Sequence, residues 1–141
     1  MGVQMFNSNS VERQVLNKIH NLKASLNYAC NQATFENTLY GLNVQKHGYA
    51  FSRYINSKWE QQESEYLPVI EWDNQWEMSL ITEGQNVVLN EDIQQVPKLV
   101  CFPSGEKTDF ELHLSHSASN SKYQLKTSSL WDIEGSWLDE K

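Results

Sequence analysis

The feature that most constrains this chain is the stretch 10–33, which contains neither Gly nor Pro. Apolar side chains recur along it every three or four residues, at Val11, Val15, Ile19, Leu22, Leu26, Ala29 and Ala33. This spacing places them on one face of an α-helix, which would be about 36 Å long at about 1.5 Å per residue. The opposite face is polar, so the sequence predicts an amphipathic helix over about 10–33 that lies on other elements.

After Ala33 the period of the apolar residues changes to that of strands. Residues 38–44 and 49–55 form a predicted antiparallel hairpin around the turn 45–48. Five more strands are predicted at 58–61, 76–82, 99–102, 110–114 and 123–127. The connections are too short for helical crossovers, so the strands must be antiparallel. The prediction is an α+β fold, with a long amino-terminal helix packed on antiparallel β-sheet of about seven short strands.

Length and composition indicate one domain without an affinity for polyanions. The 141 residues can bury one core but not two. We assign 10–141 to a single domain, with a β-rich region over about 36–134, and interpret 1–9 as a disordered start or the remnant of an engineered truncation. The net charge of −7 disfavours binding to nucleic acid or to anionic lipid.

The sequence predicts neither catalysis nor a cofactor. Cys101 or Ser104 could be combined with a histidine on paper, but no local signature of a nucleophilic site accompanies either residue. His113 and His116 are three apart on a predicted strand, so their side chains point to opposite faces and cannot readily share a metal ion. We therefore expect a protein that is not an enzyme and holds no metal.

Trp59, Trp72 and Trp76 allow two interpretations. Flat aromatic side chains on an acidic, strand-rich domain can stack against sugars. Alternatively, Trp72 and Trp76 clamp the turn at Asp73 and Asn74 and cover an edge of the core, as large aromatic residues often do. The second interpretation is favoured.

The segment 96–114 carries the most specific pattern in the chain. An apolar strand leads into the turn Pro103, Ser104, Gly105 and Glu106, and an alternating strand follows from Phe110. This segment resembles the carboxy-terminal part of the H-type minor pseudopilins (GspH) and of the related FimT-like pilins. The stretch 48–51 (Gly-Tyr-Ala-Phe) agrees with the same family.

The resemblance implies a pilin-like fold and a structural role. Such a subunit would sit at or near the tip of a type II secretion pseudopilus, with other minor pseudopilins, the major pseudopilin and secreted cargo as partners. The domain would be periplasmic, and a preceding hydrophobic helix, absent here, would anchor the full-length protein in the inner membrane. A type IV pilus minor pilin and a secreted carbohydrate- or peptide-binding module are the alternatives. The acidic, aromatic stretch 130–141 argues against DNA as a partner.

Two further expectations follow from the predicted packing. Strands of five or six residues span about 17 to 20 Å, so a helix of about 36 Å should project beyond them. Val11, Val15 and Ile19 would then form an exposed apolar surface for assembly. Cys30, on the inner helix face, and Cys101, on a strand, should lie close together, either as a disulfide or as two buried thiols.

Overall fold

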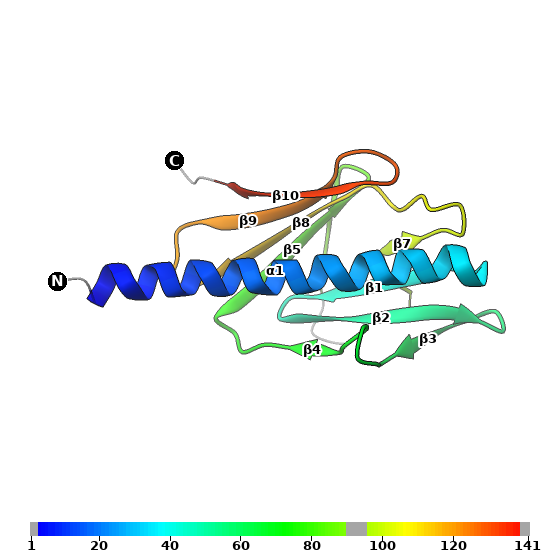
Figure 1. Cartoon of the computed structure of the whole chain (residues 1–141), viewed down its shortest axis with the longest axis horizontal. Coiled ribbons are helices and arrows are strands. Elements are labelled where there is room, and N and C mark those ends of the chain that lie inside the picture. Colours follow the sequence, from blue (N-terminus) through cyan, green and yellow to red (C-terminus); the bar gives the residue numbers. More distant parts are fainter. Residues whose placement is uncertain (1–2, 90–95, 139–141) are drawn as a thin grey trace.

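The computed structural model describes the backbone of residues 3–89 and 96–138, and the side chains of 10–89 and 96–138. It contains one long helix, α1 (Val3–Glu36), lying across two antiparallel sheets (Figure 1). The helix begins at Val3 rather than near Ser10, where the sequence pattern places its start. Extending a helix is far less costly than nucleating one, and 3–9 contain no Gly or Pro to stop it.

The carboxyl end of α1 is fixed by a local cap. Asn37 takes a positive φ of 56°, the left-handed conformation that commonly terminates helices. The amide of Thr38 then donates to the carbonyl of Ala33 at 3.0 Å. No helix in the described part of the chain is both long enough and apolar enough to cross a membrane.

The first sheet follows the hairpin that the sequence predicts. Its strands are β1 (Tyr40–Gln45), β2 (Gly48–Ile55), β3 (Lys58–Gln62), β4 (Ile70–Glu71) and β7 (Leu99–Cys101). They are ordered β3-β2-β1-β7, and β4 pairs with β2 beside β3.

The second sheet is built from the later strands. These are β5 (Trp76–Thr82), β6 (Gln85–Val87), β8 (Phe110–His116), β9 (Lys122–Thr127) and β10 (Ile133–Leu138), in the order β10-β9-β8-β5-β6. Both sheets meet α1, which packs against β1 and β7 of the first and against β8 and β9 of the second.

The described residues thus form ten strands, where the sequence predicts about seven. The seven expected strands are present within about two residues of the predicted bounds. Missing from the prediction are β4 and β6, which are too short to show a period, and β10, whose side chains are mostly exposed and do not alternate. β10 also contains Gly135, where an added Cβ would come within 2.7 Å of the ring of Tyr123.

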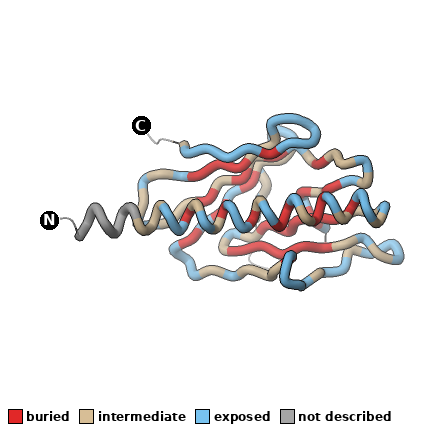
Figure 2. The backbone as a smooth tube through the Cα atoms, in the orientation of Figure 1, coloured by how far each residue is buried: buried red, intermediate tan, exposed pale blue. Residues whose placement is uncertain are grey.

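The core lies between α1 and the two sheets (Figure 2). The stripe of α1 is buried from Val15 to Ala33. On the sheets, the most deeply buried side chains include Leu42, Phe51, Leu80, Leu112, Leu114 and Leu125.

Candidate functional site

The exposed apolar helix surface that the sequence predicts is not present. Val15 is 0% exposed and Ile19 is 1% exposed, so both belong to the core, and Val11 is half-buried. The prediction assumed that a single sheet lies beneath the helix. Instead, β8 and β9 of the second sheet extend under the part of α1 that the first sheet leaves uncovered.

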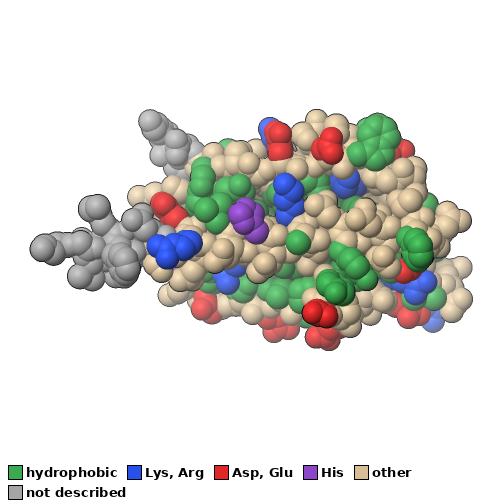
Figure 3. Space-filling model, in the orientation of Figure 1, with side chains coloured by type: hydrophobic (Ala, Val, Ile, Leu, Met, Phe, Trp, Pro, Cys, Tyr) green, Lys and Arg blue, Asp and Glu red, His purple; other side chains and the backbone are tan. Residues whose placement is uncertain are grey.

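The outward face of α1 is the surface that remains available. It is formed mainly by uncharged polar side chains, including Gln14, Asn17, His20, Asn21, Asn27 and Asn31. Between Lys23 and Glu36 the helix has no charged residue at all, in a chain whose net charge is −7. In Figure 3 this side of the molecule is largely tan, the colour of the backbone and of side chains that are neither hydrophobic, charged nor His, with scattered Lys, Arg, His and hydrophobic side chains among it. Phe35, close to the end of the helix, is 85% exposed.

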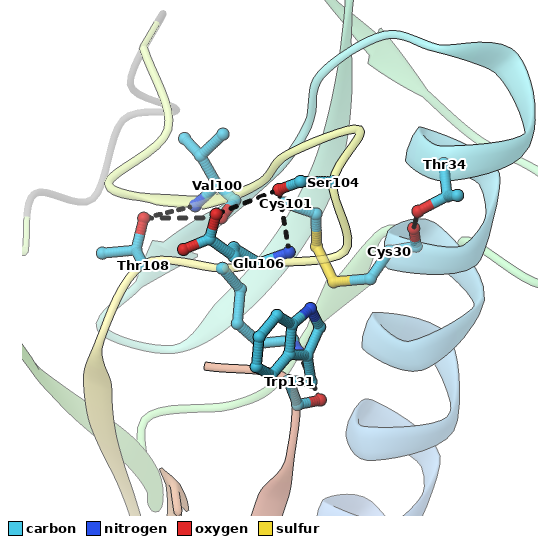
Figure 4. The surroundings of a disulfide bond; sticks show 9 residues. Cys30, Thr34, Val100, Cys101, Ser104, Glu106, Thr108 and Trp131 are labelled. Carbon is cyan, nitrogen blue, oxygen red and sulfur yellow. Dashed lines mark hydrogen bonds between the residues drawn. A yellow bond between two sulfur atoms is a disulfide. The ribbon is translucent and has the colours of Figure 1, made fainter. Parts of the chain in front are cut away.

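A disulfide joins the helix to the first sheet. Cys30 and Cys101 are bonded, with their Cα atoms 5.0 Å apart and a sequence separation of 71. This is one of the two arrangements expected for the pair. The bond is buried and fastens the last third of α1 to β7 (Figure 4).

The turn Pro103, Ser104, Gly105 and Glu106 lies beside this disulfide. The hydroxyl of Ser104 accepts from the amide of Glu106 at 3.3 Å and donates to its carboxylate at 3.2 Å. Gly105 has a φ of 95°, a conformation that favours glycine, and an added Cβ there would meet the indole of Trp131 at 3.1 Å. These contacts give the turn a structural role, in which it shapes the surface around the disulfide.

Lys107, directly after the turn, is a buried cation. Its Nζ donates to the backbone carbonyl of Trp131 at 2.7 Å, which holds the loop before β10 against the turn. Burial lowers the pKa of this ammonium, and the nearby carboxylate of Asp132 partly opposes the shift. Lys107 is therefore a tether between two loops.

The three tryptophans do not form one flat platform. Trp72 and Trp76 lie together with ring centroids 6.1 Å apart, around a turn in which the amide of Gln75 donates to Asp73 at 2.9 Å. This confirms the clamped turn. Trp59 packs instead against Tyr54, at 5.2 Å.

The histidines on β8 face different neighbours, as their spacing predicts. His113 lies 3.2 Å from the amide oxygen of Gln124, whereas the ring of His116 packs edge-on against Trp76 at 4.5 Å. Within residues 3–89 and 96–138 no three His, Cys, Asp or Glu side chains are grouped to hold a metal ion. Cys101 is oxidised, and Ser104 bonds to Glu106 rather than to a histidine, so the pairings considered for catalysis are not assembled.

A groove of about 440 Å³ lies beside α1. One wall is α1 itself, with Ser25 and Tyr28, and the other is the segment 65–72 that leads into and past β4. Tyr49 of β2 also lines it. Of its aromatic residues only Trp72 was a candidate from the sequence, because the tyrosines of the groove come from distant parts of the chain.

Comparison with known proteins identifies the fold. The sequence matches no protein-family model and no curated protein. Two solved structures of the minor pseudopilin EpsH from the type 2 secretion system of Vibrio cholerae are similar, with TM-scores of 0.62 and 0.61 and identities of 12% and 14%. The first alignment covers 94% of both chains, and the second covers 92% of this chain and 90% of the other. The solution structure of E. coli GspH is also similar, with a TM-score of 0.65 and 16% identity over 83% of each chain. The chain therefore has the pilin-like fold seen in these proteins.

Proposed function

We propose that this chain, which has the fold of the minor pseudopilins, is itself an H-type minor pseudopilin, a structural subunit at or near the tip of a type II secretion pseudopilus. The observation that carries the proposal is the shared arrangement of one long helix on two antiparallel sheets. It extends over 83 to 94% of this chain in the three comparisons. The segment 96–114, with its Pro-Ser-Gly-Glu turn, points to the same family from the sequence alone.

The outward face of α1 suits a subunit that packs its helix against neighbours. Burying a charged side chain costs far more than burying an amide that finds a hydrogen-bond partner. The stretch 24–35 carries no charge, and its exposed residues include Asn27 and Asn31. This face therefore can approach other helices without leaving charges unpaired. Its partners are the other minor pseudopilins and the major pseudopilin, and the rest of the surface faces secreted cargo.

The chemistry of the domain fits a structural role in the periplasm. The Cys30–Cys101 disulfide is a bond that persists in oxidising compartments. An apolar segment preceding α1 would anchor the full-length protein in the inner membrane before assembly. The domain then contributes a shaped, acidic surface rather than a reaction.

Deletion of the gene in its host tests this proposal. We expect substrates of the type II system to accumulate in the periplasm, and the gene carried on a plasmid to restore their release. Fractionation and immunoblotting of one such substrate measure both effects. Normal secretion in the deletion strain would contradict the proposal. Loss of type IV pili with normal secretion would assign the chain to the pilus machinery instead.

A further inference from the structure

The groove beside α1 contains polar groups that the fold does not use. It lies between α1 and the segment 65–72, which runs along the helix on the side of β4 (Figure 1). Its volume of about 440 Å³ falls in the range of small-molecule sites, roughly 300 to 1,000 Å³.

Two hydroxyl groups in the wall have no partner among the described residues. Tyr49 is only 2% exposed and Ser25 only 9%, and no hydrogen bond to either hydroxyl is formed within that part of the chain. Neither oxygen is fully enclosed, however, so water in the groove can bond to both hydroxyls. Burial raises the pKa of Tyr49 to about 12, with no hydrogen bond contributing to the shift. Because both residues line the groove, a ligand that enters it displaces this water and must itself pair the two hydroxyls.

Aromatic rings provide the flat surfaces of the groove. Tyr28 of α1 and Tyr66 of the facing segment are stacked, with centroids 5.0 Å apart and planes at 27°. Trp72 lines the groove as well, and it packs edge-on against Tyr49 at 5.8 Å. Tyr66 is 57% exposed, so its ring is accessible to a ligand. These rings can cover an apolar face of a ligand.

The charges in the groove balance each other. Lys18 and Glu65 are the two ionisable lining residues that carry a charge at neutral pH. The ammonium of Lys18 is held 5.5 Å from the ring centre of Trp72 and 4.6 Å from that of Trp76, which fixes its position. With one positive and one negative group, the groove favours a ligand without net charge.

We propose that this groove binds a short neutral saccharide of one or two pyranose rings. A pyranose has an apolar C–H face that packs against an aromatic ring, and hydroxyls around its edge that both donate and accept hydrogen bonds. It therefore fits the rings of Tyr66 and Trp72 and the hydroxyls of Ser25 and Tyr49 at the same time. An aliphatic or aromatic peptide side chain would cover the two hydroxyls without pairing them, which would weaken its binding.

An NMR titration tests the proposal on the folded chain. Cellobiose, maltose and N,N′-diacetylchitobiose are added separately to ¹⁵N-labelled protein, with the tripeptide Ala-Phe-Ala as the competing class of ligand. We expect at least one disaccharide to shift the amides of 18–28 and 65–72 and the indole N–H of Trp72, in a saturable manner. The signals of β9 and β10, which do not line the groove, should not move.

Removal of the two hydroxyls separates binding from stability. Tyr49→Phe and Ser25→Ala each delete one oxygen and keep the packing, so each should weaken saccharide binding by about tenfold, the equivalent of one hydrogen bond. Neither should lower the melting temperature, because neither hydroxyl supports the fold. Tyr54→Phe, which removes a tyrosine hydroxyl outside the groove, is the matched control and should leave binding unchanged.

Three results would overturn the proposal. The first is that none of the three disaccharides shifts the groove signals. The second is that the tripeptide shifts them and the sugars do not, which would make the groove a peptide site. The third is that a saccharide binds equally well to the Tyr49→Phe/Ser25→Ala double variant, since the unpaired hydroxyls would then have no part in recognition.

Discussion

The two faces of α1 differ more than any other two regions of the molecule. The inner face is apolar and sealed against both sheets, with Val15, Leu26 and Ala33 each at most 1% exposed. The outer face carries amides such as Asn17, Asn27 and Asn31, all exposed. A single helix thus holds the domain together on one side and presents a mainly uncharged polar surface on the other. Substitutions on the two faces should separate folding from assembly.

The largest effect is expected where a charged side chain replaces a buried apolar one. Val15→Asp would place a carboxylate at a fully buried site without a partner, which should cost at least about 4 kcal/mol of unfolding free energy. Chemical denaturation followed by circular dichroism measures this loss. Asn17→Asp, two residues away on the outer face, is the matched control and should leave stability nearly unchanged. If both variants were equally stable, the assignment of Val15 to the core would be wrong.

A milder substitution, the truncation of a core leucine, tests the same inner face of α1. Leu26 is 1% exposed, so Leu26→Ala should remove apolar burial and leave a cavity, at a cost of about 2 to 5 kcal/mol. Asn27→Ala alters the adjacent, exposed position and should change the unfolding free energy by no more than about 0.5 kcal/mol. A melting temperature that falls equally in both variants would show that the helix is stabilised by its local sequence rather than by its inner face.

The disulfide strengthens the inner face at one point. Cys30 and Cys101 close a loop over 71 residues of sequence separation, so reducing the bond should cost about 2 to 4 kcal/mol. Denaturant titrations with and without a reductant measure the difference, and thiol titration of the unfolded protein checks the oxidation state. The Cys30→Ser/Cys101→Ser double variant should be insensitive to reductant. Two free thiols in the unreduced protein would contradict the bond.

Tyr49, next to the helix on the groove side, should give the domain a sensitivity to alkaline pH. Burial raises its folded-state pKa from 10.0 to about 12, so between these values the unfolded chain loses a proton that the folded chain retains. Stability is therefore full below pH 10 and falls as pH rises toward 12, by about 2 to 3 kcal/mol from this residue.

The contribution of Tyr49 can be isolated by difference. Tyr40 acts in the same direction, because burial and its hydrogen bond to Glu36 also raise its pKa to about 12. Lys107 acts in the opposite direction, since burial lowers its pKa and stability should rise as the ammonium deprotonates. Both are retained in Tyr49→Phe, so this variant should lose less stability than the wild type between pH 10 and 12. If the unfolding free energy fell equally with pH in Tyr49→Phe and in the wild type, the Tyr49 hydroxyl would not be desolvated.

The sequence predicted the elements better than it predicted their arrangement. The period of 3.6 identified the inner stripe of α1, and alternation identified strands such as Trp76–Thr82. Periodicity cannot show how strands divide between sheets. That is why Val15 and Ile19 were expected to project, although the second sheet covers them.

The groove was harder to predict from the sequence than the core. Tyr28 and Tyr66 stack only because the segment before β4 folds back along α1, and neither residue belongs to a local motif. One signal was present: Tyr28 is a large aromatic residue placed beside the apolar stripe rather than within it. The placement of Ser25 and Tyr49 in the wall of the groove depends on three-dimensional packing and leaves no pattern in the chain.

The smallest effect on stability is expected on the outer face of α1. Substitutions there also test most directly whether the two faces of the helix have separate roles. Asn27 and Asn31 are one helical turn apart and exposed, so Asn27→Glu/Asn31→Glu adds two like charges to a surface that has none between Lys23 and Glu36. Like charges four residues apart destabilise a helix by only about 0.2 to 0.5 kcal/mol, so the isolated domain should melt almost as the wild type does. In the proposed filament, the same charges would be buried without partners against a neighbouring helix, which should prevent assembly and block secretion.

Complementation of the deletion strain measures the second effect, with Gln61→Glu on β3 as a control that adds a charge away from α1. Normal secretion with the doubly charged helix would show that the outer face of α1 contacts no other subunit, because two unpaired carboxylates cannot be accommodated in a helix interface without loss of affinity. If secretion failed and the isolated domain also unfolded, Asn27 and Asn31 would support the fold as the inner face does. The two faces of α1 would then not separate folding from assembly. Only a folded domain that no longer supports secretion agrees with a helix that stabilises the domain on one side and binds its neighbours on the other.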